Sequence, residues 1–487
     1  MNGSVFLDTL GNLRRLWSGL ANSLRDGEKP PQVDPELPEE DQRRVRKLMR
    51  TCLEAKGGEV SARMRAAAVG QVYLTLDATG RRRFLELLAT DFEVDREELC
   101  AAALEVQAAK SDEAFQRARQ QLRDALVAPR QRLLSQFNTL RQGVKFLIDM
   151  RADLLGCEES IPALEGLDRE FQRLLATWFD VGFLELRQIT WDSPAALLEK
   201  LIAYEAVHAI HSWQDLRNRL ESDRRCYAFF HPAMPEEPLI FIEVALVEGL
   251  SGSIQELLDQ SAPDMDPEKA DTAIFYSISN TQKGLRGISF GSFLIKQVVD
   301  DLRHRFPNLK IFSTLSPIPG FMRWARPLLA ADSEDPLEER TRQAVAEAAE
   351  RLQVPPLLEE VVAVDGWWRD EEVARQLGEP LLELCARYLY QRRGDEAPLD
   401  PVERFHLGNG ARIERINWLG DTSENGMRQS CGLMVNYLYK LDEIEKNHER
   451  YAAEKRIAAA KKVRALLESS EEQGERRAGF GRFLPGR

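Results

Sequence analysis

The sequence predicts an α+β protein, in which an all-α helical bundle precedes a mixed α/β domain. Through residues 39–180, apolar side chains recur three or four positions apart, as at Leu133, Phe137 and Leu140, and this spacing places them on one face of a helix. After about Trp178, short runs rich in β-branched and aromatic residues are bounded by Pro, Gly and Asp, which is typical of strands. A chain of 487 residues is also too long for one ordinary hydrophobic core, so two or three domains are expected.

Three parts are expected along the chain. Residues 1–172 should form the helical bundle, with a role in docking or oligomerisation, residues 173–465 the mixed domain, and residues 466–487 a disordered tail. Within the mixed domain, residues 332–393 return to helical spacing and are expected to form a helical insertion. The Ala-rich segment that begins at residue 450 is expected to be a charge-laced helix running into the tail. The strands are expected in the runs RCYAFF, PLIFIEVALVEG, DTAIFYSIS, LKIFSTLS, ARIERINWL and SCGLMVNYLYKL.

The composition argues against several classes of partner. The 66 basic and 79 acidic side chains give a net charge of −13, which would repel nucleic-acid phosphates. The six cysteines are scattered and form no C-x-x-C pair, which argues against a disulfide framework or a thiolate zinc site and favours the reducing cytoplasm. No apolar run approaches the roughly 20 residues needed to cross a bilayer. We therefore expect no nucleic-acid partner, no membrane contact and no metal.

The N-terminal segment has helical apolar spacing through Phe6, Leu10, Leu13 and Trp17. Aspartates within this segment, Asp8 among them, argue against a transit peptide, because such peptides are poor in acidic residues. A docking helix and a frayed end are the two interpretations that remain open.

The most informative local feature is a glycine-rich turn between the strand DTAIFYSIS and an amphipathic helix. Gly284, Gly287 and Gly291 would let the backbone approach an anion and adopt positive φ, and the N–H groups that open the helix would present partial positive charge to a phosphate. Lys283 and Arg286 add full charges beside them. The turn lacks the signatures of a P-loop and of a dinucleotide site, and its spacing alone also fits a turn without a ligand. It resembles the pyrophosphate loop of acetyltransferase-like (GNAT-type) folds, which implies coenzyme A or an acyl derivative as the ligand.

Five segments, in the same order along the chain, resemble one known family. They are CYAFFHPAMPEEPLIFIEVAL, DTAIFYSISNTQKGLRGISFGSFLIK, STLSPIPGF, RFHLGNGARIERINWLGD and SCGLMVNYLY. Over residues 178–439 the chain is similar to malonyl-CoA decarboxylase. The resemblance implies an acetyltransferase-like catalytic domain that binds acyl-CoA and a helical domain that assembles a homotetramer or dimer. It also implies the conversion of malonyl-CoA to acetyl-CoA in fatty-acid metabolism.

The family motifs carry over to individual positions of this sequence. Ser316 in LSPIPGF matches the catalytic serine, and His406 in RFHLGNG matches the catalytic histidine. Tyr439, in the closing SCGLMVNYLY, is a weaker candidate for substrate contact. At Ser289 we expect some relatives to carry an acidic residue, so any help that such a residue gives the serine is absent here. The segment that matches the acyl-CoA-binding loop comprises Arg286, Gly287, Ile288, Ser289, Phe290, Gly291 and Ser292.

Taken locally, both catalytic candidates have plainer interpretations. A serine before Pro-x-Pro-Gly is commonly a turn residue, and a histidine between Phe405 and Leu407 is commonly packed in a core. Only the family motif favours the catalytic interpretation. His208, His211 and His231 lack the acidic partners of a metal cluster, and His231 is expected to line the acyl-CoA cleft.

The chemistry of the implied reaction suits these residues. Loss of CO2 from malonyl-CoA leaves an electron pair that the thioester carbonyl accepts as an enolate, so no cofactor is expected. His406 would protonate the enolate carbon, because an ordinary imidazole titrates at about pH 6.5. Ser316 would hydrogen-bond the departing carboxylate without stabilising the substrate's charge as strongly as an arginine would. The pair would also fit a histidine that acts as a base toward the serine, and the loop would also fit an acyltransferase that acetylates amines or an acyl-CoA sensor.

Overall fold

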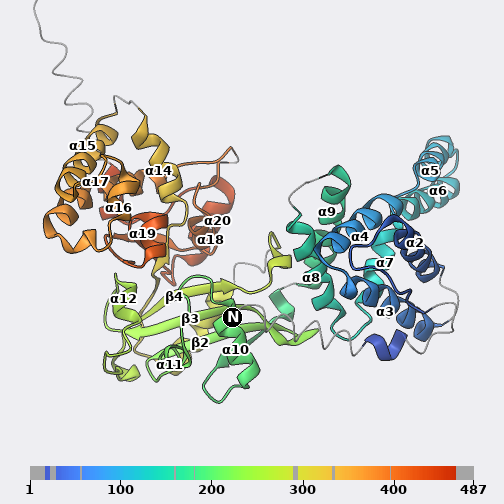
Figure 1. The fold of residues 1–487 in the computed structure, drawn as a ribbon, viewed down its shortest axis with the longest axis horizontal. Helices are drawn as coiled ribbons and strands as arrows, with labels where there is room; N and C mark the ends of the chain where they lie inside the picture. The colour runs from blue at the N-terminus through green and yellow to red at the C-terminus, as the bar shows by residue number, and fades with distance from the viewer. Residues whose placement is uncertain are drawn as a thin grey trace, which may run out of the picture.

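The structure, a computed structural model, describes residues 17–21, 29–54, 58–157, 161–179, 181–288, 294–331, 335–394 and 396–467. An all-helical region precedes a region built on one mixed sheet, and the two lie side by side along the long axis of the molecule (Figure 1). This arrangement confirms the predicted α+β fold class. Among the described helices, none combines the length and the hydrophobicity that crossing a bilayer requires.

Capping residues set the beginnings of several helices in the first region. The side chains of Asp77, Asp95 and Ser111 accept hydrogen bonds from backbone N–H groups at the starts of three helices. Pro129 and Pro162 open two others, at a position where a missing N–H is tolerated. The helices are α2 (Glu39–Leu53), α3 (Glu59–Thr75), α4 (Ala78–Asp91), α5 (Arg96–Ala108), α6 (Asp112–Ala125), α7 (Pro129–Phe137), α8 (Gly143–Leu155) and α9 (Pro162–Trp178). The hairpin of α5 and α6 projects from the end of the molecule, whereas α8 and α9 lie nearest the sheet (Figure 1).

Trp17 packs into the core of the helical region. Its side chain is fully buried, its ring centroid lies 4.8 Å from that of Phe146, and it stacks against Phe137. The indole Nε1 donates a hydrogen bond to the carbonyl of Arg141 at 3.1 Å. The other residues of the predicted amphipathic spacing, Phe6, Leu10 and Leu13, lie outside the described residues.

The mixed sheet has the strand order β1-β2-β3-β4-β5-β8-β6, with β7 paired to β8. Neighbouring strands are antiparallel except β4 and β5, which are parallel. The strands are β1 (Glu185–Ile189), β2 (Arg224–His231), β3 (Met234–Val247), β4 (Thr272–Asn280), β5 (Ile311–Thr314), β6 (Ser316–Pro317), β7 (Arg412–Asn417) and β8 (Met434–Leu438). Every predicted run overlaps one of these strands. The sequence does not predict β1. In this edge strand only Ile189 is buried, and Ile189 is also its single β-branched residue.

Helices pack against this sheet, and those of the C-terminal part form a second layer on one side of it (Figure 1). The helices α14 to α20 gather on one side of the sheet, and one hydrophobic core runs from Phe312 on β5 to Leu377 and Leu381 in this layer (Figure 1). The predicted helical insertion corresponds to α15, α16 and α17. The elements are η1 (Val181–Phe183), α10 (Ala195–Tyr204), α11 (Trp213–Asn218), α12 (Ile254–Leu257), η2 (Pro267–Lys269), η3 (Lys283–Leu285), α13 (Leu294–Arg305), α14 (Phe321–Ala330), α15 (Pro336–Leu352), α16 (Leu358–Ala363), η4 (Trp367–Arg369), α17 (Glu371–Leu389), α18 (Pro401–Gly408), α19 (Glu424–Ser430) and α20 (Ile444–Glu454).

A register shift between β3 and β4 determines which side chains of β4 share a face of the sheet. Val244 of β3 pairs with Phe275, but the preceding Glu243 pairs with Ser277, so Tyr276 is the extra residue of a β-bulge. Beyond the bulge the alternation of side chains is therefore reversed. Asn280 consequently shares a face of the sheet with Phe275, and Ser277 lies on the opposite face.

The prediction of one continuous helix from residue 450 is wrong. The helix α20 ends at Glu454, and Lys455 adopts a left-handed conformation with φ of 51°. The backbone after it pairs with β7 instead: Ile413 donates to the carbonyl of Ala458, and Ala460 donates to the carbonyl of Ile413. These tertiary hydrogen bonds outweigh the helical propensity of the alanines. A helical turn resumes over 461–467, and residues 468–487 of the predicted tail lie outside the described residues.

Candidate active site

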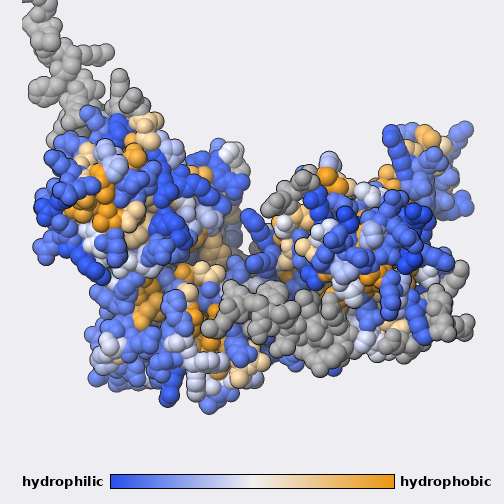
Figure 2. All heavy atoms as spheres, in the orientation of Figure 1, coloured by the Kyte–Doolittle hydropathy of each residue, from blue (hydrophilic) through white to orange (hydrophobic). Residues whose placement is uncertain are grey.

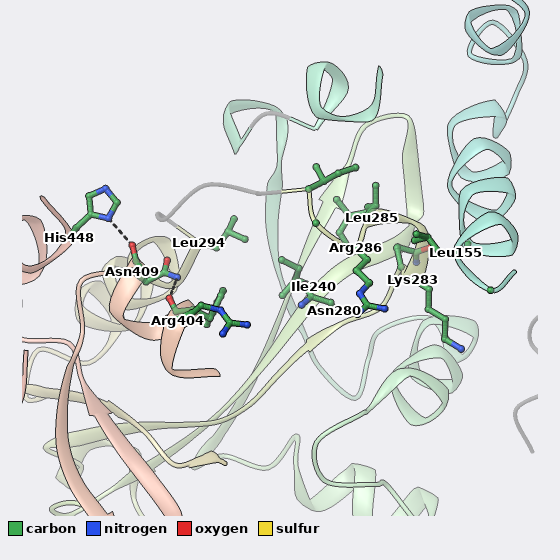
Figure 3. A pocket seen from close by; sticks show the side chains of 18 residues that line it. Leu155, Ile240, Asn280, Lys283, Leu285, Arg286, Leu294, Arg404, Asn409 and His448 are labelled. Atoms are coloured by element: carbon green, nitrogen blue, oxygen red, sulfur yellow. Dashed lines mark hydrogen bonds between the residues drawn. The ribbon is translucent and has the colours of Figure 1, made fainter. Parts of the chain in front are cut away.

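A cavity of about 1000 Å³ opens between the helical region and the helices above the sheet. Ala152 and Leu155 at the end of α8 form one wall, and the turn after β4 forms the next. Phe405 and Asn409 on α18 line the opposite side, together with His448 of α20. Figure 2 shows a notch in this position, and Figure 3 shows the lining side chains. This volume lies at the upper end of the range for small-molecule and cofactor sites.

The glycine-rich turn brings cations to this cavity. Lys283, Arg286, Gly287 and Ile288 all line it, and Gly287 has a φ of 81°, a conformation that favours glycine. Arg404 on α18 supplies a third cation from the opposite wall (Figure 3). The predicted loop residues Ser289, Phe290, Gly291 and Ser292 lie outside the described residues, so the structure places Arg286, Gly287 and Ile288 of the predicted set.

Ser316, His406 and Tyr439 come together from three separate segments. The Ser316 Oγ lies 3.1 Å from Nε2 of His406, and Nδ1 of the same ring lies 2.8 Å from the Tyr439 hydroxyl. Ser316 is on β6, His406 on α18, and Tyr439 directly follows β8. All three side chains are buried. The fold thus joins both predicted catalytic residues with the weaker candidate Tyr439 in one hydrogen-bonded chain.

The hydrogen bond from Ser316 to Thr314 assigns a donor and an acceptor to each contact among Ser316, His406 and Tyr439. The Ser316 hydroxyl donates to the Thr314 Oγ1 at 2.8 Å, so its single proton is not directed at His406. Nε2 of His406 must therefore carry the hydrogen that Ser316 accepts. Nδ1 of the neutral ring is then an acceptor, and the Tyr439 hydroxyl donates to it. The Thr314 Oγ1 is itself held by the backbone N–H of Tyr437 at 3.1 Å.

Burial keeps the imidazole of His406 neutral. Desolvation lowers the pKa of His406 to about 3, because the interior disfavours the charged ring. The Tyr437 ring stacks against it with centroids 4.6 Å apart and an interplanar angle of 23°. Burial also raises the pKa of Tyr439 well above its ordinary value, so its hydroxyl keeps its proton and can donate. The expectation that His406 titrates near its ordinary pKa is thus wrong for the free protein.

The helix α18 holds His406 in place from its first turn. Asp400 is fully buried and accepts hydrogen bonds from the backbone N–H groups of Val402 and Glu403. Pro401 occupies the first helical position, as is favourable at a helix start. Together they fix the beginning of an eight-residue helix that ends at Gly408. A short, capped helix gives the imidazole a defined position opposite β6.

The three clustered residues lie beside the cavity and not in its lining. Arg404, Phe405 and Asn409 face the cavity, whereas His406, on the same helix, turns its ring toward Ser316. Along β4, Phe275 contacts Tyr439, and Asn280 lines the cavity. Because Tyr276 is a bulge residue, this stretch of β4 pairs with only four residue steps of β3, from Val244 to Ile240, which cover about 14 Å at 3.4 Å per residue. A ligand bound in the cavity must extend over about this length of β4 to reach the clustered residues.

Part of the cavity lining carries no signal in the sequence, and one residue that we expected in the cleft lies elsewhere. Arg404 and Asn280 lie within segments that resemble the family, but neither is predicted as a site residue, and the wall formed by α8 carries no sequence signal. His231 does not line the cavity. Its Nε2 lies 3.0 Å from the carbonyl of Trp178, and its ring packs on Phe179, so it joins β2 to the end of α9.

Comparisons with known proteins agree with this architecture. The family model for the malonyl-CoA decarboxylase C-terminal domain matches residues 182–477, and that for the malonyl-CoA decarboxylase N-terminal domain matches residues 92–179. Mitochondrial malonyl-CoA decarboxylase of Anser anser anser is 37% identical over 430 residues, with 85% of each chain covered. The enzyme of the same name from Rattus norvegicus is 38% identical over 406 residues, covering 80% of this chain and 82% of that one.

Solved structures match over most of the chain as well. The crystal structure of malonyl-CoA decarboxylase from Rhodopseudomonas palustris is 44% identical, with a TM-score of 0.79, and covers 87% of this chain and 99% of that one. The one from Agrobacterium vitis is 41% identical, with a TM-score of 0.77 and the same coverage. Ser316, His406 and Tyr439 all lie within residues 182–477, which the C-terminal family model matches. The chain therefore belongs to the malonyl-CoA decarboxylase family.

Proposed function

We propose that this chain decarboxylates malonyl-CoA to acetyl-CoA and CO2. The observation that carries the proposal is the hydrogen-bonded chain of Ser316, His406 and Tyr439 beside a large cavity lined by cations. These groups supply what the reaction needs: a hydroxyl for the leaving carboxylate, a proton carrier for the enolate and a site for the anionic coenzyme. The relatives and solved structures described above carry the same activity in their names.

The coenzyme occupies the cavity, with its phosphates at the turn after β4. Lys283 and Arg286 supply positive charge there, and the left-handed Gly287 lets the backbone approach an anion. Arg404 faces them across the cavity. The pantetheine arm follows β4 from Asn280 toward Phe275, which brings the malonyl group to the clustered residues.

Binding of the substrate changes the charge of His406. The malonyl carboxylate places a negative charge beside a buried neutral imidazole, and an opposite charge raises the pKa of a histidine. The ring takes up a proton from solvent as the carboxylate enters. The substrate thereby creates the acid that the reaction needs, although the free protein holds this ring neutral.

The reaction then proceeds in two steps. The bond between C2 and the carboxylate carbon breaks, CO2 leaves, and the electron pair moves into the thioester as an enolate. The imidazolium of His406 gives its proton to C2, which forms the methyl group of acetyl-CoA and restores the neutral ring. One proton is consumed in each turnover, the one taken up on binding. The substrate's thioester is the electron sink, so this scheme uses no cofactor.

Ser316 acts on the carboxylate in this scheme. Its hydroxyl rotates from Thr314 toward the substrate and holds the carboxylate out of the thioester plane, where the breaking bond overlaps the carbonyl. In the alternative, His406 is a base toward Ser316. The Ser316 hydroxyl would then have to donate its hydrogen bond to an Nε2 that carries no hydrogen. The observed donation to Thr314 favours the carboxylate role.

The setting of this activity is also part of the proposal. We place it in fatty-acid metabolism in the cytoplasm, and we infer that the chain forms a homotetramer or a dimer. Cell fractionation tests the location, and sedimentation velocity over a range of concentrations tests the assembly. A monomer at all concentrations would contradict the assembly without affecting the reaction.

Malonyl-CoA labelled with 13C in its free carboxylate tests the reaction itself. The proposal predicts 13CO2 and unlabelled acetyl-CoA in equal amounts, without added cofactor. Transfer of an acetyl group to an added amine would instead indicate an acyltransferase. Tight binding of malonyl-CoA without release of CO2 would indicate a sensor.

A further inference from the structure

Arg151 links the helical region directly to the glycine-rich turn. It lies on α8 and is almost fully buried, with 1% of its surface exposed. Its Nε donates to the Asp168 carboxylate on α9 at 2.8 Å, and its Nη1 donates to the carbonyl of Gly284 at 2.6 Å. Hydrogen bonds from a charged donor are stronger than those between neutral groups. One guanidinium therefore joins α8, α9 and the turn.

The contact between α8 and the turn leaves no room for a side chain at Gly284. A Cβ at this position would lie 1.8 Å from the carbonyl oxygen of Ile148, which is on α8. Gly284 does not have a positive φ, whereas Gly287 does. The two glycines are therefore required for different structural reasons. Gly284 allows close packing against the helical region, and Gly287 allows the left-handed turn.

The other side of the turn is anchored to β3. Gln282 and Thr281 both donate hydrogen bonds to the carbonyl of Pro238. The backbone of the turn is therefore held between β3 and α8. Lys283 and Arg286, which lie on either side of the segment that Arg151 contacts, are the cations that line the cavity.

Arg151 itself does not line the cavity. Because its guanidinium is buried and engaged by Asp168 and Gly284, it acts on a ligand only through the turn. The same helix places Ala152 and Leu155 in the cavity wall one and four positions later. The helical region is thus a structural part of the ligand site.

We infer that Arg151 is a positioning residue for substrate binding, which fixes Lys283 and Arg286 in the cavity through the carbonyl of Gly284. The inference rests on the proposed function, because it takes acyl-CoA as the ligand. It assigns substrate affinity in part to the helical region. The cluster at His406 lies apart from this contact, so the chemical step should not depend on Arg151.

The test replaces Arg151 in the full chain and separates binding from chemistry. For Arg151→Met we expect the KM for malonyl-CoA to rise about tenfold, the loss expected for one charged hydrogen bond, while kcat changes less than about twofold. The Kd for acetyl-CoA, measured by titration calorimetry, should rise by a similar factor. Arg151→Lys keeps a charged donor and should recover part of the loss. Gly284→Ala, which displaces the same contact from the other side, should raise KM in the same direction.

Arg130→Met provides a matched control. Arg130 on α7 is also 1% exposed and also donates to a carboxylate, that of Glu170, and to a backbone carbonyl, that of Ala89. It does not line the cavity or contact the turn, so its loss should lower the Tm without changing KM.

Three outcomes separate the possibilities. An unchanged KM and an unchanged Kd for acetyl-CoA in folded Arg151→Met and Gly284→Ala would overturn the positioning role. The same increase in Arg130→Met would also overturn it, because the effect would then follow from lost stability. A parent protein that binds acetyl-CoA but does not consume malonyl-CoA would refute the proposed function, and the Kd comparison would still decide the role of Arg151.

Discussion

The Tyr439 hydroxyl lies 2.8 Å from Nδ1 of His406, the ring nitrogen that does not face Ser316. Because the Ser316 hydroxyl donates to Thr314, the hydrogen of the neutral ring is assigned to Nε2, and the Tyr439 hydroxyl is then the donor to Nδ1. Tyr439 thus has a distinct task in the proposed reaction. It orients the imidazole and does not itself need to contact the substrate.

Tyr439→Phe should therefore lower kcat and leave KM for malonyl-CoA nearly unchanged. Loss of one buried hydrogen bond to the ring corresponds to about tenfold in rate. Steady-state kinetics measures both constants. Tyr73→Phe is the control, since Tyr73 is equally buried and its hydroxyl donates to Asp153 at 2.8 Å, but in the helical region. Equal rates for the parent and Tyr439→Phe would show that the ring is positioned by other contacts.

Ser316→Ala should lower kcat by about 10²-fold or more, because a preorganised donor is lost at the reacting group. The Tm should change little, since the variant removes one hydroxyl and leaves no charge unpaired. Rapid-quench measurement of the first turnover separates the chemical step from product release. Decarboxylation at the parental rate would remove Ser316 from the mechanism.

The buried ring of His406 should make the protein sensitive to acid. The pKa is about 3 in the folded protein and about 6.5 when unfolded, so between these values the unfolded state binds more protons and stability falls as the pH falls. From pH 6.5 to pH 5 this site costs the parent about 2 kcal/mol of unfolding free energy. His406→Asn should escape this loss, which urea unfolding at the two pH values measures. Parallel losses in parent and variant would show that the ring is not held neutral.

Binding of the substrate, unlike that of the product, should take up a proton. Malonyl-CoA brings a carboxylate to His406, and acetyl-CoA does not. Titration calorimetry of Ser316→Ala in buffers of different ionisation enthalpy should give an uptake approaching one proton per site for malonyl-CoA and near zero for acetyl-CoA at pH 7.5. Equal uptake for the two ligands would contradict the proposal that the substrate protonates the ring.

The fold class and most strands follow from the sequence because their signals are local. Runs such as DTAIFYSIS are both β-rich and bounded by turn residues, and they become central strands of the sheet. The edge strand at 185–189 and the backbone pairing at Ala458 escape prediction, since both depend on partners distant in the sequence. The Ala-rich C-terminal segment shows that tertiary hydrogen bonds can override helix propensity.

The site is predictable only in part for the same reason. The motifs name Ser316 and His406, but not the 3.1 Å contact between them, which requires α18 to pack beside β6. Nor does a sequence disclose that burial lowers the pKa of His406 to about 3. The contact of α8 with the cavity and the turn corresponds to no sequence motif. In the sequence, Arg151 resembles any other charged residue on a helix. Its hydrogen bond to the carbonyl of Gly284 depends on the tertiary fold.

In the proposed reaction, this chain decarboxylates malonyl-CoA with His406 as the proton carrier. The most direct measurement compares acetyl-CoA formation, followed by mass spectrometry, for the purified parent and His406→Ala at equal concentration with no added cofactor. We expect turnover by the parent and a loss of at least about 10²-fold in the variant, at the lower end of what a positioned acid contributes. Parental activity in folded His406→Ala, or no acetyl-CoA from the folded parent, would contradict this proposal.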